Sequence, residues 1–334
     1  MPTEHSYVHT ISVVVPVYLG EKTISGIVDE LLPFVDGFET ASGRRGVVSE
    51  ILLVNDNGPD DSATVLRALQ ARHPAVRAIW LTRNFGQHAA TLAGMASSGG
   101  EWIVTLDEDG QHDPADIPGL LDVALDRGAH VVYGAPTNKP PHGYLRTASS
   151  RAAKRILSVV LAEKLNDPNQ FQSFRLLLGE VGRGVAAYAG SGVYLDVALS
   201  WVTSRVTTAP VTLRSEGREG SGYSYRSLAG HFWRMILSSG TRGLRIVSIL
   251  GAVSALAGIA FAVFLLVQRI AGGEVLPQGW TSIVTVSLLA SGAILISLGI
   301  IAEYLGVAVN MAMGKPLYMT MNDPDKGPLG RHDA

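Results

Sequence analysis

Short apolar runs alternate with helical apolar stripes along the N-terminal part of the chain. Residues 11–18 form a β-branched run that contains a proline near its end, which predicts a buried strand. Apolar residues with helical spacing follow between 21 and 35, and further strands are predicted at 51–54, 76–81 and 131–133. Strands that alternate with helices predict an α/β fold with a mostly parallel sheet covered by helices.

An acidic pair follows another apolar run, residues 104–106. Asp107 and Asp109 are separated by one residue, and Gln111 comes two positions later. Because ligands bind beyond the carboxyl ends of the strands in open α/β sheets, these side chains are predicted to converge on a site. Hard oxygen donors there suit Mg²⁺ or Mn²⁺ bridging a diphosphate. An isolated Asp-x-Asp is more often a solvated acidic turn, so the neighbouring motifs decide between the two interpretations.

Four motifs together resemble a known family. They are residues 16–18 with Glu21, the turn at 54–56, residues 83–89, and residues 106–114. In this order and spacing they are similar to the family 2 inverting glycosyltransferases. More narrowly, they resemble the polyprenyl-phosphate glycosyltransferases, which include dolichol-phosphate mannose synthases and bacterial undecaprenyl-phosphate glycosyltransferases. The resemblance covers nearly the whole chain and implies a GT-A-type, Rossmann-like nucleotide-sugar domain.

The resemblance also implies roles for individual residues. Asp109 and Gln111 would bind the metal ion, and Asp107 would contact the metal or the ribose. The residues implied in nucleotide-sugar binding are Pro16, Tyr18, Glu21, Asp56, Arg83, Asn84, Gln87 and Asp107. The implied catalytic residues are Asp107, Asp109, Arg175 and Arg218. His88 and His112 are each a candidate catalytic base, although a histidine in such a position is more often structural. Asp113, which precedes Pro114, is expected to cap a helix and is kept as a minor site candidate.

The acceptor phosphate requires positive charge, and a predicted helix at 144–164 carries several basic residues. Arginine forks suit phosphate, although a solvated basic face is the alternative for each of these residues taken singly. The acceptor-phosphate candidates are Arg146, Arg151, Lys154, Ser173 and Arg175.

Two positions depart from the family pattern. Ser173 stands where related bacterial enzymes often carry an acid that is proposed as a general base. A phosphate monoester has a second pKa near ~6, so its oxygen is already anionic in the cytosol and no strong base is required. Gly222 replaces a customary lysine, and Arg218 or Arg214 is expected to supply the charge instead.

Bulk composition places part of the chain in lipid. Of 334 residues, 47% are hydrophobic and only 17% are charged. This hydrophobic fraction exceeds the apolar content that a purely soluble enzyme needs. The absence of cysteine excludes disulfides and thiolate metal sites. A net charge of −2 gives no overall attraction to nucleic acid, so no nucleic-acid partner is expected.

The apolar excess is concentrated in two uncharged segments, 246–267 and 280–302. Each approaches the roughly 20 apolar residues that cross a bilayer, which predicts a two-helix transmembrane hairpin; a buried core hairpin is the alternative. Residues 227–239 are amphipathic and predict either an interfacial helix or one packed on the catalytic domain. Arginines flank the hairpin more than its connecting loop, so both termini are predicted to be cytoplasmic. The polar N-terminus predicts no signal peptide.

The predicted organisation has four parts. A cytosolic glycosyltransferase domain (1–225) is followed by juxtamembrane amphipathic helices (226–245), two transmembrane helices (246–305) and a cytosolic tail (306–334). This places the protein in the inner (plasma) membrane as a multi-pass protein whose catalytic domain faces the cytoplasm. A homo-oligomer is left open.

The expected function is inverting transfer of one sugar from a nucleotide-diphosphate sugar, expected to be a UDP-sugar, to undecaprenyl or a similar polyprenyl phosphate. One alternative is a processive polysaccharide synthase. Such synthases usually carry Gln-x-x-Arg-Trp and more spans, whereas Leu176 follows Arg175 here. Another is a non-catalytic membrane scaffold, against which Asp107, Asp109 and Gln111 argue. A dinucleotide-dependent oxidoreductase is disfavoured because no Gly-x-Gly-x-x-Gly follows the first strand.

Overall fold

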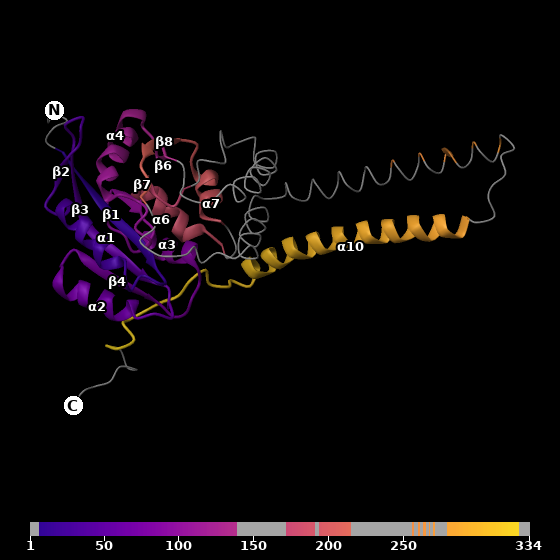
Figure 1. The fold of residues 1–334 in the computed structure, drawn as a ribbon, viewed down its shortest axis with the longest axis horizontal. Coiled ribbons are helices and arrows are strands. Elements are labelled where there is room, and N and C mark those ends of the chain that lie inside the picture. Colours follow the sequence, from indigo (N-terminus) through magenta and orange to yellow (C-terminus); the bar gives the residue numbers. More distant parts are fainter. Residues whose placement is uncertain are drawn as a thin grey trace. The chain divides into compact units, whose positions relative to one another are not determined.

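The computed structural model describes residues 7–138, 172–190, 194–214 and 279–326, with isolated helical positions between 256 and 270 (Figure 1). The chain divides into two units. One consists of Met1–Gly230 with Pro316–Ala334, and the other of His231–Lys315. The helix predicted at 144–164 and the juxtamembrane segment predicted at 226–245 lie outside the described residues.

The first unit is built on a mixed sheet, which has nine strands in the described part of the chain. The strands are β1 (Val8–Val17), β2 (Phe38–Glu39), β3 (Arg45–Asn55), β4 (Val76–Leu81), β5 (Trp102–Thr105), β6 (Val131–Pro136), β7 (Arg175–Leu178), β8 (Val206–Val211) and β9 (Thr320–Met321). Their order is β8-β6-β7-β5-β1-β3-β4-β9, with β2 paired to β3. The central strands β5, β1, β3 and β4 are parallel, as predicted. β7 runs antiparallel to both of its neighbours, β5 and β6.

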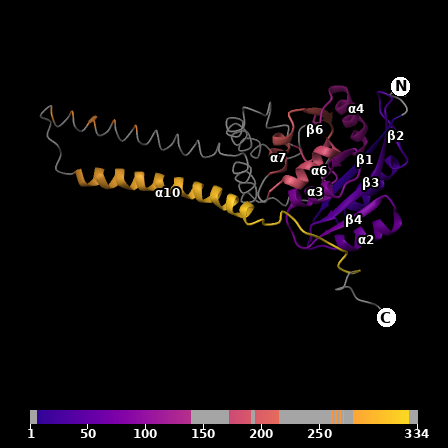
Figure 2. The same ribbon diagram turned by 180° about the vertical axis from the view of Figure 1, so that it is seen from behind.

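Helices cover both faces of this sheet, as Figures 1 and 2 show from opposite sides. The helices are α1 (Ile24–Leu31), α2 (Ser62–Arg72), α3 (Gln87–Ala96), α4 (Ile117–Arg127), α6 (Gly179–Tyr188) and α7 (Leu195–Val202). Apolar residues of α1, α2 and α4 belong to one core cluster, and those of α3, α6 and α7 to a second. Side chains alternate between these clusters along β1, where Val13 and Val15 contribute to the first and Val14 to the second. The sheet is therefore buried between two helical layers.

Two predicted elements have different bounds in the structure. The helix predicted from residue 21 begins at Ile24, because the amides of Thr23 and Ile24 both bind the Gly20 carbonyl and form a turn first. It continues into a 3₁₀ turn, Leu32–Phe34, which contains a proline. The strand predicted at 51–54 extends back to Arg45 as β3.

A strand from the C-terminal tail completes one edge of the sheet. β9 pairs antiparallel with β4, and the Thr82 amide donates to the Met319 carbonyl at 3.0 Å. Arg67 of α2 binds the Asp323 carboxylate through Nε at 2.9 Å and contacts Asp325 at 2.6 Å. The tail thus covers an edge whose amides and carbonyls would otherwise lack strand partners.

The second unit contains α10 (Gly279–Ala312), a helix of 34 residues. Among the described residues it provides the one helix long and apolar enough to cross a membrane, Ala290–Ala312, with a mean hydropathy of 2.0 and none of it buried. The span predicted at 280–302 lies inside α10, which continues ten residues beyond it. The other span, predicted at 246–267, is described only at isolated positions, so the two-helix hairpin remains a prediction.

Candidate active site

One edge of the sheet, formed by the carboxyl ends of β1, β3, β4 and β5, carries most of the predicted site residues. Pro16 is buried within β1. The exposed members are Tyr18, Glu21, Arg83, Asn84 and Gln87. The partly buried members are Asp107, Asp109, Gln111 and Ser173. Residues far apart in sequence are therefore gathered at one edge, as the parallel topology predicts.

Asp107 joins three loops at this edge. The Gln87 side chain, at the start of α3, donates from Nε2 to Asp107 Oδ1 at 2.5 Å. The Ser173 hydroxyl, just before β7, donates to its Oδ2. Ser173 reaches Asp107 because β7 is antiparallel, so the beginning of this strand lies beside the end of β5. Both carboxylate oxygens of Asp107 are held in place before any ligand binds.

Asp109 and Gln111 form a tight turn that projects their side chains from the same loop. The Gln111 amide donates to Asp109 Oδ1 at 3.0 Å, and Gly110 between them has a φ of 73°, a left-handed conformation that favours glycine. The Arg214 amide donates to the Gln111 carbonyl at 2.9 Å and ties this turn to the end of β8.

The oxygen donors of this loop fit a hard divalent cation that is shared with a ligand. Asp107, Asp109 and Gln111 supply carboxylate and amide oxygens. In the described part of the chain, no group of three carboxylate, histidine or cysteine side chains could enclose a metal alone. Mg²⁺ is commonly held in this way, by one or two carboxylates with water and phosphate oxygens completing its shell.

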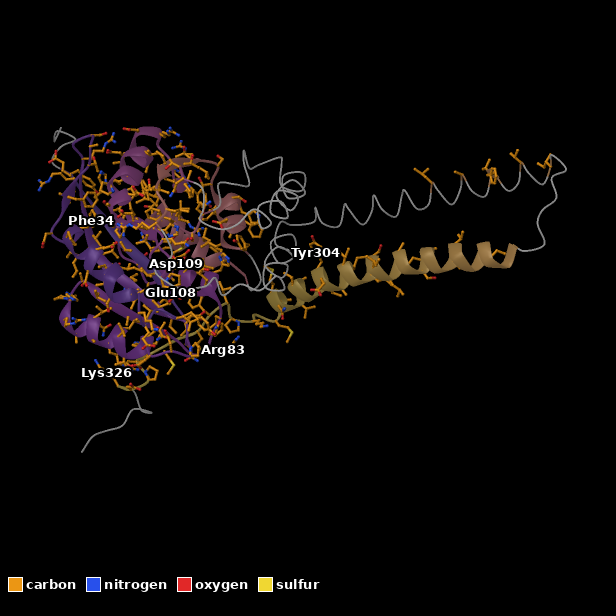
Figure 3. All side chains as sticks on the ribbon, in the orientation of Figure 1. Phe34, Arg83, Glu108, Asp109, Tyr304 and Lys326 are labelled. Atoms are coloured by element: carbon orange, nitrogen blue, oxygen red, sulfur yellow. The ribbon has the colours of Figure 1, made fainter. Side chains whose placement is uncertain are left out.

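Glu108, which was not among the predicted site residues, holds the loop after β1. Its carboxylate accepts hydrogen bonds from the Tyr18 amide at 2.8 Å and the Leu19 amide at 3.0 Å. A Cβ at Gly20 would lie 2.9 Å from Glu108 Oε2, so the approach is close. Figure 3 marks Glu108 beside Asp109. No local sequence signal separates Glu108 from its acidic neighbours, because its role depends on the loop after β1 lying beside the turn at 108–110.

Asp56, predicted to contact the nucleotide, shapes the loop after β4. It is 2% exposed, and its carboxylate accepts from the Phe85 amide at 2.7 Å and the Gly86 amide at 2.8 Å. Burial raises the pKa of Asp56, an effect that these two amides and the nearby Arg83 charge oppose. Arg83 lies over the Phe85 ring, 4.0 Å from its centroid.

Glu21 links the loop after β1 to the loop after β3 by hydrogen bonds. Its amide donates to Asp60 at 3.0 Å, and its carboxylate accepts from the Asp61 amide at 3.3 Å. The loops after β1, β3, β4 and β5 are therefore linked to one another by carboxylate-to-amide hydrogen bonds.

Arg175 occupies a different environment from the one predicted. Arg175 was predicted to contact the acceptor phosphate, but its side chain is only 4% exposed and pairs with Asp196 of α7. The neighbouring strands bury it, because β7 lies inside the sheet between β5 and β6. A direct phosphate contact does not fit this placement.

The remaining predicted residues have mixed outcomes. Arg146, Arg151, Lys154 and Arg218 lie outside the described residues. Arg214, the alternative to Arg218, is engaged by Glu30 at 2.8 Å and Asp113 at 2.5 Å. Asp113 caps the following turn by accepting from the Ala115 amide at 2.9 Å, which confirms its predicted role.

Comparison with known proteins identifies the family. The model of "Glycosyl transferase family 2" matches residues 12–189, more than half of the chain. This chain belongs to glycosyl transferase family 2. The match spans the strands and loops that assemble the carboxylate edge, so the predicted resemblance is confirmed for the part of the molecule that carries the site.

Curated relatives of this glycosyltransferase match it over most of its length. The undecaprenyl-phosphate 4-deoxy-4-formamido-L-arabinose transferase of Klebsiella pneumoniae (strain 342) is 30% identical over 313 residues, covering 93% of this chain and 92% of that protein. The enzyme of the same name from Edwardsiella ictaluri is 28% identical, with 93% of each chain covered. These alignments extend well beyond the residues of the family model.

Solved structures share the fold of this glycosyltransferase. The crystal structure of glucosyl-3-phosphoglycerate synthase from Mycobacterium tuberculosis with Mn²⁺, UDP and phosphoglyceric acid has a TM-score of 0.51 and 20% identity, covering 70% of this chain and 78% of that one. The same enzyme with Mg²⁺ and UDP has a TM-score of 0.51 and 19% identity, covering 70% and 79%. At this identity the likeness establishes a GT-A-like α/β fold.

Proposed function

We propose that this protein transfers one sugar from a nucleotide-diphosphate sugar, a UDP-sugar, to undecaprenyl or a similar polyprenyl phosphate, with inversion at the anomeric carbon. The observation that carries the proposal is the 30% identity to an undecaprenyl-phosphate sugar transferase over 93% of this chain. That alignment includes both the carboxylate edge and most of the apolar C-terminal part, which a soluble transferase would not need.

The donor binds at the carboxylate edge in this proposal. Asp109 and Gln111 hold Mg²⁺ or Mn²⁺, and Asp107 orients the ribose or the ion. The bound ion would supply Lewis acidity that stabilises the negative charge developing on the departing phosphate. The neighbouring structures that hold Mn²⁺ or Mg²⁺ together with UDP support the choice of ion and nucleotide. Tyr18, Glu21 and the loop 83–87 surround the nucleotide.

The acceptor is a nucleophile that needs little activation. Its phosphate oxygen is anionic at cytosolic pH, because the second pKa of a phosphate monoester lies near ~6. Ser173, which has no basic side chain, therefore suffices where related enzymes carry an acid. Arg146, Arg151, Lys154 and Arg218 are proposed to bind the two phosphate groups.

The site is proposed to work at the cytoplasmic face of the inner membrane. α10 is exposed and apolar along Ala290–Ala312, so it is suited to lipid. With a second span at 246–267, both termini and the catalytic unit would lie on the cytoplasmic side, where a membrane-bound acceptor and a soluble donor can meet.

The test is a product assay on membranes that contain the protein. Membranes are incubated with a panel of labelled nucleotide sugars and undecaprenyl phosphate. The lipid is then extracted, and the mass of the lipid product is measured by mass spectrometry. We expect one hexose or pentose unit on the lipid phosphate, with product reduced about 10²-fold or more in an Asp109→Asn control. Polymeric product would instead identify a processive synthase, and absence of lipid-linked sugar with every donor would contradict the proposal.

A further inference from the structure

A buried polar cluster lies directly behind Asp107 and Ser173. Arg175 of β7 forms an ion pair with Asp196 in the first turn of α7, and their side chains are 4% and 3% exposed. Tyr133 of β6, 1% exposed, donates its hydroxyl to the same carboxylate at 2.9 Å. The Arg175 guanidinium also lies 5.6 Å from the centroid of the Tyr133 ring. Three elements thus contribute one polar group each to a single interior site.

The charges in this cluster stabilise one another. Burial disfavours the charged form of Arg175, but Asp196 together with Tyr133, Tyr194 and Asp107 outweighs it, so the Arg175 pKa is raised. Burial also raises the pKa of Asp196, against the opposing effects of the Arg175 charge and the Tyr133 hydrogen bond. Burial, with the nearby Asp196 charge, raises the pKa of Tyr133 well above its ordinary value, so its phenol stays protonated and donates. A buried ion pair is costly to desolvate and is often no more stable than apolar residues of the same size. Stability alone is therefore a weak explanation for this cluster.

Short links connect the cluster to the active-site edge. Arg175 is in register with Thr105 of β5 on one side and Tyr133 of β6 on the other. Arg175 Nε donates to the Ser173 carbonyl at 3.4 Å, and the Thr105 hydroxyl donates to the same carbonyl. The Ser173 hydroxyl donates to Asp107. Arg175 and Thr105 therefore fix the Ser173 carbonyl, while the Ser173 hydroxyl binds Asp107.

We propose that Asp196, Arg175 and Tyr133 are positioning residues that fix Ser173 against Asp107 and so orient the Asp107 carboxylate toward the donor. The inference rests on the proposed function for the identity of that donor. Asp196 anchors Arg175, Arg175 and Thr105 fix the Ser173 carbonyl, and the Ser173 hydroxyl sets one oxygen of Asp107. Gln87 sets the other oxygen from α3.

The test is a double-mutant cycle between the two ends of this chain of contacts. Asp196→Asn, Ser173→Ala and the double variant are compared with the wild type for kcat, donor KM and the affinity for UDP in the presence of Mn²⁺ by calorimetry. Each single variant is expected to lower kcat or UDP affinity about 10-fold, as loss of one charge-assisted contact does. The double variant should lose little more than either single variant, because both break one route.

Two further variants keep the test falsifiable if Asp196→Asn folds poorly. Tyr133→Phe removes only a hydroxyl from the cluster and should give a smaller effect in the same direction. Asp122→Asn is the matched control, since Asp122 is another buried aspartate that binds Thr40 and Arg44 near the start of β3. It should lower the unfolding temperature and leave kcat and UDP affinity unchanged.

The outcomes separate this inference from the proposed function. Additive losses in the cycle, or cluster variants that behave like Asp122→Asn, would overturn the positioning role. A wild type that binds UDP with Mn²⁺ but makes no lipid-linked sugar would overturn the proposed acceptor, and the cycle would still be scored on UDP affinity.

Discussion

Three successive residues of one loop perform three separate tasks. Asp107 is held between Gln87 and Ser173, Glu108 binds the backbone after β1, and Asp109 is fixed by the turn at Gly110. A carboxylate offers two acceptor oxygens, so it can accept amide hydrogens and still present negative charge to a cation. The acidic run is therefore a set of individually oriented side chains, and substitutions within it should have different kinetic signatures.

Asp109→Asn tests the proposed metal ligand. The amide keeps the size of the side chain and an acceptor for the Gln111 amide, so we expect the fold to persist while turnover falls by about 10² or more, since the variant loses the negative charge that binds the cation. Steady-state rates and the unfolding temperature are measured together. EDTA should reduce wild-type turnover comparably, and activity that survives both treatments would contradict metal dependence.

Glu108→Gln tests whether the Glu108 carboxylate holds the loop after β1. A glutamine retains one acceptor but loses the charge that binds the Tyr18 and Leu19 amides, so the loop after β1 should loosen. We expect donor KM to rise about 5- to 10-fold with a smaller change in kcat, because the loss affects nucleotide binding. Glu101→Gln, at the opposite end of β5, is the control and should leave both constants unchanged. Equal kinetics for the two variants would refute this role.

The sequence could identify which residue types gather at the site, and it could not assign their partners. Asp107, Asp109 and Gln111 were predicted because their spacing after a strand is local information. The contacts of Asp56 with Phe85 and of Glu108 with Tyr18 depend on how separate loops meet in three dimensions. Arg175 was misplaced for the same reason, since its burial follows from β7 entering the sheet.

At the scale of elements, the loops after β1, β3, β4 and β5 are linked by hydrogen bonds, and the tail strand β9 supports one of them. β9 pairs with β4, and β4 leads directly into Thr82 and the loop at 83–87. Restricting these loops before the donor arrives reduces the entropy that binding must overcome. Removing a support at the edge should therefore affect the nearest loop first.

Asp323→Asn tests the attachment of the tail. Hydrogen bonds from Arg67 and the Asp325 amide, together with the Arg67 charge, lower the pKa of Asp323 against the opposing effect of burial. Because the folded pKa is below the unfolded value, the carboxylate stabilises the attached tail above pH ~4, and this contribution is lost as pH falls through the lower folded value. At pH 7 the variant should lose about 1–3 kcal/mol of local stability.

Hydrogen exchange of β4 and β9 amides at several pH values measures this loss. The difference between wild type and Asp323→Asn should shrink as the pH falls below ~4. Asp325→Asn is the matched control, because Asp325 pairs with the same Arg67 but its side chain is 66% exposed. Exposed pairs contribute about 0–1 kcal/mol. Identical exchange in both variants would show that Asp323 does not fasten the tail.

Periodicity predicted the elements better than it predicted their order. Strands β1, β4 and β5 were predicted as buried apolar runs, and helix α1 was predicted from apolar residues at helical spacing. The antiparallel insertion of β7 and the return of β9 were not predicted. Both strands are short, and their places in the sheet depend on pairing partners that lie far away in the sequence.

At the scale of the whole molecule, one chain combines a nucleotide-sugar fold with an apolar helix suited to lipid. The catalytic unit contains both Met1–Gly230 and Pro316–Ala334, so the chain leaves it for His231–Lys315 and then returns. If both termini of the intervening segment join the same unit, a membrane-spanning region between them must cross an even number of times. This supports the predicted second span at 246–267, which pairs with α10.

Cysteine labelling tests this even number of crossings, and the absence of native cysteines makes the chain suitable for it. Gly273→Cys lies in the segment predicted to connect the two spans, so it should react with a membrane-impermeant thiol reagent on cells with a permeabilised outer membrane and an intact inner membrane. Ala71→Cys, an exposed site in the last turn of α2, should react only after the inner membrane is opened. Ala71 suits this purpose because its side chain faces solvent, so lack of labelling reports the membrane barrier and not burial.

Labelling of Ala71→Cys in intact cells would place the catalytic unit outside, away from the cytosolic donor. Protection of both sites until the inner membrane is opened would indicate that the connecting segment does not cross.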